Sequence, residues 1–278
     1  MIEKYLCESK EINLSSTLDG GQCFRWHKFE NGFNGVINNE CYFIFEKNNC
    51  IYVSSDNLKN NKLNILNDYL DLKFDIKKFS SNFKKNKYLS GLFNKYYGLR
   101  ILKQDQWEAM VSFITSSVSN VSKIKKNIND LCLNLGKKIG NNKYDFTFPE
   151  PKEILEFGET NLRKIGFGFR SPYIINASKM IIEDDNFLRS IFDLSYEESL
   201  LKLTSIKGVG RKVADCIMTY GYHRKDVFAV DRWVRRGLVN NLGYNEGYSN
   251  DKLSEIARSN FGSYSSYLQQ YIFYGEKS

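Results

Sequence analysis

A glycine hairpin that leads into a helix is the feature that most constrains this chain. The segment Ile206–Cys216 reads IKGVGRKVADC, and Asp231 follows nineteen residues after Lys212. Two glycines one residue apart allow a tight turn that exposes successive backbone N–H groups, and such a turn at a helix start suits a phosphate. An ordinary turn between two helices with a surface lysine is the alternative interpretation. The presence of both Lys212 and Asp231 favours a nucleic-acid partner.

Charge and length set the broad class of the protein. The chain has 40 lysines and arginines against 32 aspartates and glutamates in 278 residues, a net charge of +8. Long-range attraction then favours an anionic partner without specifying which one. A hydrophobic fraction of 42% at this length is enough to bury a sizeable core, in one large domain or two of moderate size.

The sequence also argues against several classes of protein. Residues 1–8 contain no apolar signal core, and no apolar run approaches the ~20 residues that span a bilayer. We therefore expect an intracellular, cytoplasmic protein with no targeting segment and no membrane contact. The six cysteines form no CxxC pair and have no histidine cluster beside them, so we expect free thiols and no metal site. Because Cys216 is the last cysteine, we expect no four-cysteine iron–sulfur loop after it.

Aromatic and β-branched residues dominate the first part of the chain. They are concentrated in residues 41–46 and 50–54, which flank Lys47-Asn48-Asn49. Two such runs separated by a short asparagine-containing turn predict a β-hairpin. We therefore predict that the chain up to the eighties is mainly antiparallel sheet, with a helix or two.

Helical spacing replaces this pattern farther along. Apolar residues recur every three to four positions from Trp107 onward, and Pro149 and Pro151 indicate a loop between two helical stretches. The predicted fold class is therefore α+β. It consists of an N-terminal antiparallel β-sheet domain, residues 1–88, followed by an all-helical domain, residues 89–278.

The segment Ser205–Trp233 resembles the helix-hairpin-helix motif and the following Gly/Pro-Asp loop of DNA glycosylases. The catalytic lysine and aspartate of the lyase-active members of that family correspond to Lys212 and Asp231. The Gly/Pro-rich part of the loop is replaced here by Val227–Val230, so only its aspartate is retained. The resemblance implies that the hairpin binds the DNA backbone and that the helical domain is a helix-hairpin-helix glycosylase domain. The implied hairpin contacts are Gly208, Val209 and Gly210.

The chemistry of that family suits these two residues. A lysine amine can attack the sugar C1′ as positive charge develops there, provided that desolvation or nearby positive charge lowers its pKa. The product is a Schiff base with the opened sugar, from which the 3′ phosphate can leave by β-elimination. Asp231 would stabilise the developing cationic sugar, and its side chain could also cap a helix that begins at Arg232.

Further segments narrow the resemblance to the 8-oxoguanine DNA glycosylases. KVADC at Lys212–Cys216 and GGQCFRW at Gly20–Trp26 are similar to segments of that subfamily. Three other stretches, distributed over nearly the whole chain, are similar as well. They are Leu99–Asp105, Phe113–Ser117 and Leu162–Arg170.

The resemblance also implies a pocket for the extruded base. Cys216 and Phe273 would hold the base between them, and Gln269 would read its Watson–Crick edge. The carbonyl of Gly21 would accept the N7 hydrogen that 8-oxoguanine has and guanine lacks, a difference on the order of a few kcal/mol in a buried site. The i, i+4 spacing of the glutamine and the aromatic residue recurs one position later, so both registers stay open. The later pair is Gln270 and Tyr274.

At the positions that would contact the base left behind in the duplex, this sequence differs from the eukaryotic members of the subfamily. Those members have three asparagines and, three residues later, an arginine, whereas this chain has Val118, Ser119, Asn120 and Lys123. Valine has no donor for a cytosine edge, and lysine lacks the planar fork of arginine. Phe169 matches an aromatic wedge, and Arg170 matches its partner arginine. We therefore expect excision opposite all four bases with modest differences.

Taken together, the resemblance implies a DNA repair enzyme. It would flip 8-oxoguanine out of double-stranded DNA, excise it through a lysine Schiff base, and have associated abasic-site lyase activity. We expect a monomer that needs no cofactor. Two alternatives stay open, a glycosylase for another damaged purine and a non-catalytic helix-hairpin-helix DNA-binding module.

Overall fold

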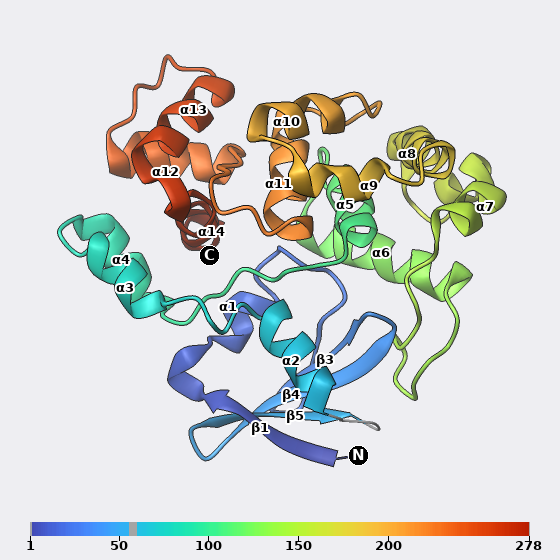
Figure 1. The fold of residues 1–278 in the computed structure, drawn as a ribbon, viewed down its shortest axis with the longest axis horizontal. Coiled ribbons are helices and arrows are strands. Elements are labelled where there is room, and N and C mark those ends of the chain that lie inside the picture. Colours follow the sequence, from blue (N-terminus) through green and yellow to red (C-terminus); the bar gives the residue numbers. More distant parts are fainter. Residues whose placement is uncertain (1, 56–59, 278) are drawn as a thin grey trace. The chain divides into compact units, whose positions relative to one another are not determined.

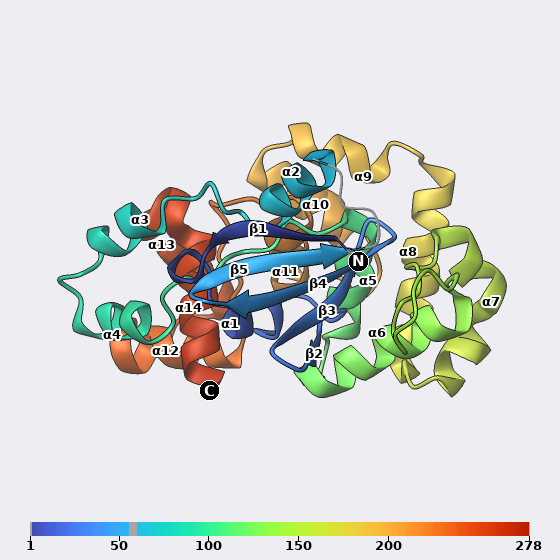
Figure 2. The ribbon, with the colours of Figure 1, turned by 90° about the horizontal axis from the view of Figure 1, so that it is seen from below.

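The computed structural model describes residues 2–55 and 60–277. Its strands are β1 (Ile2–Glu8), β2 (His27–Phe29), β3 (Gly32–Ile37), β4 (Glu40–Lys47) and β5 (Cys50–Ser55). They form one antiparallel sheet in the order β1-β5-β4-β3-β2, and Figure 2 shows β1, β5 and β4 side by side. Helices make up most of the remaining chain, which confirms the predicted α+β class. None of the described helices is long and apolar enough to cross a bilayer.

The chain divides into two compact units, each built from separated segments. Unit 1 comprises Met1–Gln22, Ile44–Lys103 and His223–Ser278, and unit 2 comprises Cys23–Phe43 and Gln104–Tyr222. The division passes through β4, so it does not follow the order of the sequence. The boundary expected between residues 88 and 89 stays a prediction.

The predicted hairpin of the first part is confirmed. Strands β4 and β5 are joined by Asn48 and Asn49, whose φ angles are 53° and 58°. A two-residue turn with both residues at positive φ matches the right-handed twist of the flanking strands, and asparagine tolerates that conformation better than most residues. The same solution recurs between β3 and β4, where Asn38 and Asn39 have φ angles of 48° and 61°.

Unit 1 is organised around an aromatic core. Its helices are α1 (Leu14–Leu18), α2 (Asn60–Tyr69), α3 (Ile76–Asn82), α4 (Lys87–Lys95), α12 (Arg232–Leu242), α13 (Asn250–Phe261) and α14 (Ser265–Lys277), with 3-10 turns η1 (Ser9–Glu11) and η4 (Gly262–Tyr264). Helix α14 packs against α4, α12 and α13 (Figure 1). The ring of Phe79 lies 5.1 to 5.8 Å from those of Phe93, Tyr267 and Tyr271. These apolar rings bury α14 on the side that faces α3 and α4.

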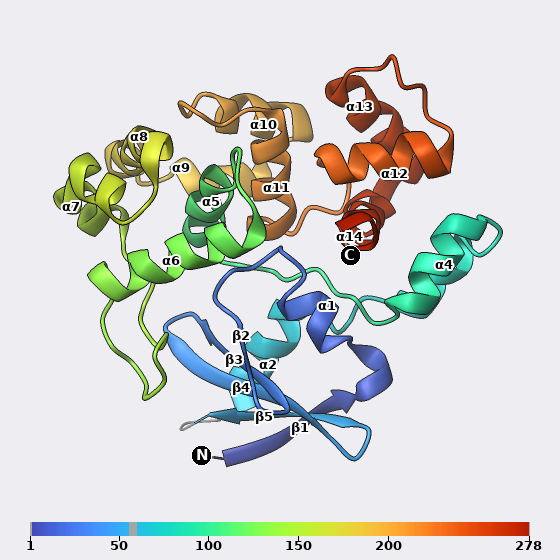
Figure 3. The same ribbon diagram turned by 180° about the vertical axis from the view of Figure 1, so that it is seen from behind.

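Unit 2 contains the hairpin and the helix that follows it. Its helices are α5 (Gln106–Thr115), α6 (Val121–Leu135), α7 (Pro151–Lys164), α8 (Ser171–Glu183), α9 (Phe187–Ser190), α10 (Tyr196–Thr204) and α11 (Arg211–Gly221), with 3-10 turns η2 (Gly168–Arg170) and η3 (Ile191–Asp193). Helices α5 and α11 pack side by side, as Figures 1 and 3 show. Phe113 of α5 stacks on Tyr220 of α11, with ring centroids 5.0 Å apart and an interplanar angle of 15°. The packing of these two helices fixes where the first turn of α11 lies relative to the end of α5.

One detail of the predicted helix boundaries is wrong. Pro149 lies in a loop as expected, and its carbonyl accepts a bond from Trp107 Nε1 at 2.9 Å. Pro151, however, is the first residue of α7. Proline suits this position because the first N–H groups of a helix have no intrahelical partner and the ring presets a helical φ.

Candidate active site and DNA-binding surface

The glycine hairpin adopts the predicted turn between α10 and α11. Gly208 has a φ of +87°, and a Cβ at this position would lie only 2.3 Å from Cγ of Tyr173. Both facts require glycine, because other residues avoid this φ and none could avoid the tyrosine ring. Val209 is buried, and its N–H donates to the carbonyl of Ile206 at 3.0 Å. The hairpin is therefore a rigid turn that is anchored within unit 2.

The start of α11 has no side-chain cap. Gly210 is the N-cap residue, with extended backbone angles, and it has no side chain that could accept from the first N–H groups. Helix N-termini carry a partial positive charge, and their unpaired N–H groups bind anions. This geometry suits the expected contact of Gly208, Val209 and Gly210 with phosphate, which stays a prediction.

Lys212 lies on the first turn of α11 and is half-buried. Its Nζ donates to Oγ of Ser116 at 3.3 Å and lies 5.9 Å from the centroid of the Phe113 ring. Both partners come from the C-terminal part of α5 and the residue after it. Sequence reasoning did not identify Ser116 as a neighbour of the lysine, because no spacing rule links positions 96 residues apart.

Asp231 is the N-cap of α12, as expected. Its Oδ1 accepts from the backbone N–H groups of Trp233 and Val234, both at 2.9 Å. No bond to Oδ2 is found among the described residues. The loop before it, Val227–Val230, is buried, and the carbonyl of Phe228 accepts from Ser254 Oγ at 2.8 Å. Burial of its apolar side chains thus fixes the conformation of this loop, which lacks the glycine and proline residues of the Gly/Pro-Asp motif. Asp231 belongs to unit 1 and Lys212 to unit 2.

The glutamine and aromatic residues expected to bind the base lie on α14. Gln269 is buried, and its Oε1 has no hydrogen-bond partner among the described residues. Phe273, one turn later, is half-buried. Of the alternative pair, Tyr274 packs edge-on against Tyr96 with ring centroids 4.8 Å apart, and Gln270 is fully buried. Tyr274 therefore has a packing partner at the C-terminal end of α4.

Gly21 lies in a turn that is fixed by hydrogen bonds of the neighbouring Gln22 side chain. Its φ is +88°, a conformation that glycine adopts without strain. The amide of Gln22 donates to the carbonyls of Thr17 and Arg100 at 2.9 and 2.7 Å and accepts from the N–H of Leu102 at 2.9 Å. The same turn reaches α14, since a Cβ on Gly20 would lie 3.5 Å from Nε2 of Gln270. Cys216, the other expected pocket residue, is buried on α11 one turn after Lys212.

The residues expected near the base left in the duplex lie around the turn after α5 and at η2. Asn120 is the N-cap of α6 and accepts from the N–H of Lys123 at 2.9 Å. Lys123 is exposed, and Val118 is 91% exposed with a φ of +49°. Phe169 is 47% exposed. These side chains are accessible, and their contact with DNA stays a prediction.

Arg170 is placed differently from its exposed neighbours. It is only 3% exposed, and its guanidinium donates to the carbonyl oxygens of Ser117 and Val118, at 2.7 Å from Nε and 2.8 Å from Nη2 respectively. Its side chain therefore holds the backbone of the turn after α5. The expected contact of Arg170 with DNA stays a prediction, and the structure adds a positioning role that the sequence did not indicate.

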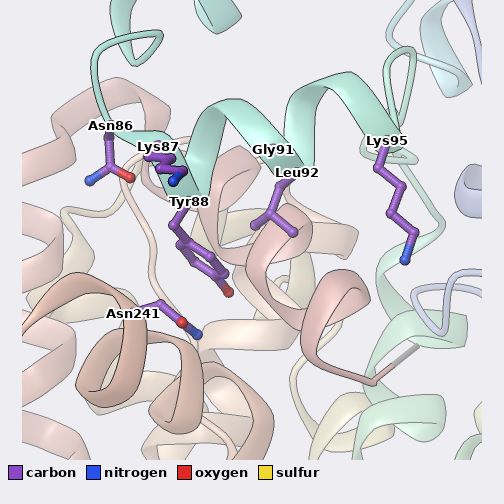
Figure 4. A pocket seen from close by; sticks show the side chains of 7 residues that line it. All are labelled: Asn86, Lys87, Tyr88, Gly91, Leu92, Lys95 and Asn241. Carbon is purple, nitrogen blue, oxygen red and sulfur yellow. The ribbon is translucent and has the colours of Figure 1, made fainter.

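Among residues 2–55 and 60–277, no group of three or more histidine, cysteine, aspartate or glutamate side chains could hold a metal ion. A depression in unit 1 is formed by α4 and α12, where the side chain of Tyr88 points toward Asn241 (Figure 4). Both side chains donate to Glu276, at 2.7 and 2.9 Å, so they tie α4 and α12 to α14. None of the candidate site residues lines this depression.

The chain is similar to several known proteins. Residues 4–110 match the family model of the 8-oxoguanine DNA glycosylase N-terminal domain, and residues 111–261 match that of HhH-GPD superfamily base excision DNA repair proteins. A probable N-glycosylase/DNA lyase of Methanothermobacter thermautotrophicus is 32% identical over 73% of this chain and 71% of its own length. The N-glycosylase/DNA lyase of Arabidopsis thaliana is 27% identical over 96% of this chain and 78% of its own length.

The chain belongs to the 8-oxoguanine DNA glycosylase/lyase family. A solved structure of the Clostridium acetobutylicum 8-oxoguanine glycosylase/lyase, in complex with double-stranded DNA containing cytosine opposite 8-oxoguanine, is 30% identical. The match covers 99% of this chain and 97% of the Clostridium acetobutylicum chain, with a TM-score of 0.91. Family membership therefore extends over both units, and the chain is a bifunctional DNA glycosylase/lyase.

Proposed function

We propose that this chain excises 8-oxoguanine from duplex DNA and cleaves the resulting abasic strand by β-elimination, with Lys212 as the nucleophile. The observation that carries the proposal is the position of the Lys212 amine, on the first turn of a helix that follows an uncapped hairpin. Its neighbours are a hydroxyl group and an aromatic ring. Among the described residues of unit 2, no carboxylate lies within 4.0 Å of Nζ. An amine without a carboxylate partner is better suited to attack than one held as an ion pair.

The chemical steps use the two protons of a neutral amine. The nitrogen attacks C1′ while the C1′–N9 bond breaks, and the amine gives one proton to the departing base. The bond from C1′ to the ring oxygen then opens, O4′ takes a proton from solvent, and a protonated Schiff base remains. Removal of a C2′ proton expels the 3′ phosphate by β-elimination, and hydrolysis regenerates the lysine.

Asp231 provides the complementary negative charge. Positive charge develops on the sugar as the glycosidic bond breaks, and a fixed carboxylate stabilises that charge. Among the described residues, the cap of α12 fixes the carboxylate through Oδ1, which supports a separate electrostatic role for Oδ2. The two roles are compatible because they use different oxygen atoms.

The proposed base pocket uses Gly21, Cys216, Gln269 and Phe273. The buried Oε1 of Gln269 is an acceptor without a partner among the described residues, and buried polar atoms are normally paired. The N1–H and N2–H groups of an 8-oxoguanine edge are donors that would satisfy it. The carbonyl of Gly21 would then meet the N7 hydrogen of the lesion, whereas guanine presents a lone pair there and is disfavoured.

The duplex itself would be held by the hairpin and by side chains around the turn after α5 and at η2. The hairpin residues Gly208–Gly210 would bind phosphate, and Asn120, Lys123, Phe169 and Arg170 would lie near the base left behind. We infer that the enzyme acts as a monomer, since each proposed role falls on residues of one chain. Mass photometry of the enzyme with and without duplex checks this stoichiometry.

Borohydride trapping tests the proposal and separates it from its alternatives. Enzyme is incubated with duplexes that contain 8-oxoguanine, another damaged purine, an abasic site or no lesion. We expect a covalent complex with the 8-oxoguanine and abasic duplexes, and its loss in Lys212→Gln. The matched control is Lys202→Gln, because Lys202 also donates to a serine hydroxyl, at 2.6 Å, and lies over a phenylalanine ring.

Each alternative has its own outcome in this experiment. Trapping on another damaged purine in preference to 8-oxoguanine would replace the proposed substrate. Absence of trapping on every duplex, with DNA binding intact, would indicate a non-catalytic binding module. Undiminished trapping by Lys212→Gln would exclude Lys212 as the nucleophile.

A further inference from the structure

The hydroxyl of Ser116 is oriented by the helix that precedes it. Its Oγ donates to the carbonyl of Phe113 at 2.7 Å, one turn back along α5. A hydroxyl has a single proton, so the oxygen can only accept from the Lys212 amine that lies 3.3 Å away. The Ser116 proton is therefore not available to bind the lone pair of a neutral amine. The contact orients the amine through one of its N–H bonds and leaves the nitrogen lone pair available to attack a carbon atom.

The turn that carries Ser116 is held from its other side by Arg170. The guanidinium donates to the carbonyls of Ser117 and Val118, and the arginine is 3% exposed. Val118 has a φ of +49°, which costs a β-branched residue of order 1–3 kcal/mol. A buried cation bonded to two successive carbonyls compensates for this conformation. Ser116 is thus fixed by α5 on one side and by Arg170 on the other.

The same arrangement occurs a second time in unit 2, at a lysine with no catalytic assignment. Ser190 Oγ donates to the carbonyl of Phe187 at 3.0 Å and accepts from Lys202 Nζ at 2.6 Å, and this Nζ lies 4.7 Å from the Phe187 ring centroid. Lys202 also has a carboxylate nearby, unlike Lys212 among the described residues of unit 2, since Asp184 lies 3.7 Å from its amine. A carboxylate stabilises the charged ammonium form, which cannot attack carbon. Lys202 is thus a comparison for Lys212, the proposed nucleophile, in similar surroundings.

We propose that Ser116 is a positioning residue for the Lys212 amine, and that Arg170 acts through it by fixing the turn after α5. This inference rests on the proposed role of Lys212 as the nucleophile. The hydroxyl restricts the rotation of the amine, so that more of the enzyme has its lone pair aligned for attack when DNA is bound. The ring of Phe113, with its centroid 5.9 Å from Nζ, is a second neighbour of the same amine.

Single-turnover excision of 8-oxoguanine from duplex DNA tests the positioning role. We expect Ser116→Ala to lower the rate at saturating enzyme about tenfold, the size of one lost hydrogen bond. The enzyme concentration that gives half the maximal rate and the melting temperature should stay at the wild-type values. Ser116→Thr keeps the hydroxyl and should recover most of the rate. Ser190→Ala is the matched control and should excise at the wild-type rate.

A double-mutant cycle tests the part assigned to Arg170. Lysine keeps the charge but lacks the planar fork that spans two carbonyls. We expect Arg170→Lys to slow excision in the wild-type background and to have no further effect in Ser116→Ala. Equal slowing in both backgrounds would show that Arg170 acts independently of Ser116.

The outcomes separate this inference from the proposed function. If Lys212→Gln abolishes borohydride trapping while Ser116→Ala excises at the wild-type rate, the nucleophile stands and the positioning role is overturned. If Lys212→Gln is trapped normally, the proposed function fails first. A fall in rate that accompanies an equal loss of thermal stability in Ser116→Ala and Ser116→Thr would reduce Ser116 to a packing residue.

Discussion

The carboxylate of Asp231 combines a structural task with a proposed catalytic one. Oδ1 accepts both N–H bonds of the α12 cap, and the aspartate is half-buried. Asparagine at an N-cap accepts the same bonds and is about as favourable as aspartate. The negative charge can therefore be removed without loss of the cap, which makes this residue a clean test of electrostatic stabilisation.

We expect Asp231→Asn to slow excision of 8-oxoguanine by about 10²-fold or more, because an electrostatic partner of the developing charge is lost. Binding of the lesion duplex and the melting temperature should change little. Single-turnover excision and a thermal melt on the same preparation check both points. Equal excision rates for the variant and the wild type would leave Asp231 with the cap as its sole role.

The register on α14 can be decided by two substitutions at neighbouring positions. Tyr274 packs on Tyr96, whereas Phe273 is half-buried and its ring lies 5.8 Å from Lys277 Nζ. We expect Phe273→Ala to weaken lesion binding by roughly 1–3 kcal/mol, the value of one base stack. Tyr274→Ala should instead lower the melting temperature. Fluorescence anisotropy with lesion and undamaged duplexes, together with melts, distinguishes the two registers, and the reverse pattern would favour Gln270 and Tyr274.

At the scale of elements, Asp71 joins segments of unit 1 that are distant in sequence. It lies in the turn after α2, and its Oδ2 accepts from Tyr267 of α14 at 2.7 Å. The same oxygen lies 3.1 Å from His223 Nε2 and 3.4 Å from Lys225 Nζ. Its backbone carbonyl accepts from buried Arg100 at 2.9 Å. Burial, the largest influence, raises the pKa of Asp71, but bonds from His223 and Tyr267 and the charge of Lys225 outweigh it, so the pKa is lowered.

The lowered pKa of Asp71 predicts how its contribution to stability varies with pH. A carboxyl group whose pKa is lower in the folded state stabilises the fold above its unfolded pKa, about 3.9, and loses that contribution as pH falls through the folded value. We expect Asp71→Asn to lower the free energy of unfolding by about 1–3 kcal/mol at neutral pH. The difference from the wild type should shrink below pH 4. Urea unfolding at several pH values measures it, and a difference independent of pH would contradict the assigned cause.

At the scale of the whole molecule, two exposed apolar side chains belong to the region proposed to meet the opposing base. Val118 is 91% exposed and Phe169 is 47% exposed, and Arg170, whose guanidinium lies 4.4 Å from the Phe169 ring centroid, is occupied by backbone carbonyls. Apolar groups offer no directional bonds that distinguish one base edge from another. The arrangement therefore favours contact with any opposing base.

We expect excision of 8-oxoguanine opposite all four bases with modest differences in rate. Each specific hydrogen bond that is absent removes about 1–3 kcal/mol of discrimination. Single-turnover rates with each opposing base provide the measurement. Val118→Asn, which restores donor and acceptor groups and tolerates a positive φ, should raise the preference for cytosine. A preference of several hundredfold for cytosine over adenine in the wild type would show that other residues read the opposite base.

The sequence by itself determined the features that depend on a few neighbouring residues. The tight turn at Gly208–Gly210, the cap formed by Asp231 and the Asn48–Asn49 turn follow from local steric and hydrogen-bonding rules, so their positions were predicted correctly. Pro151 shows the limit of such rules, because proline is compatible with both a loop and the first position of a helix. The function was predicted from the similarity of many short segments to one family.

The tertiary structure alone decided which side chains meet. The contact of Ser116 with Lys212, the burial of Arg170 and the convergence of Tyr267, His223 and Lys225 on Asp71 each join positions far apart in the chain. No sequence periodicity predicts these contacts, because they arise when α5 packs on α11 and when α14 packs within unit 1. The sequence could therefore predict Lys212 as the nucleophile, whereas only packing brought Ser116 to its amine.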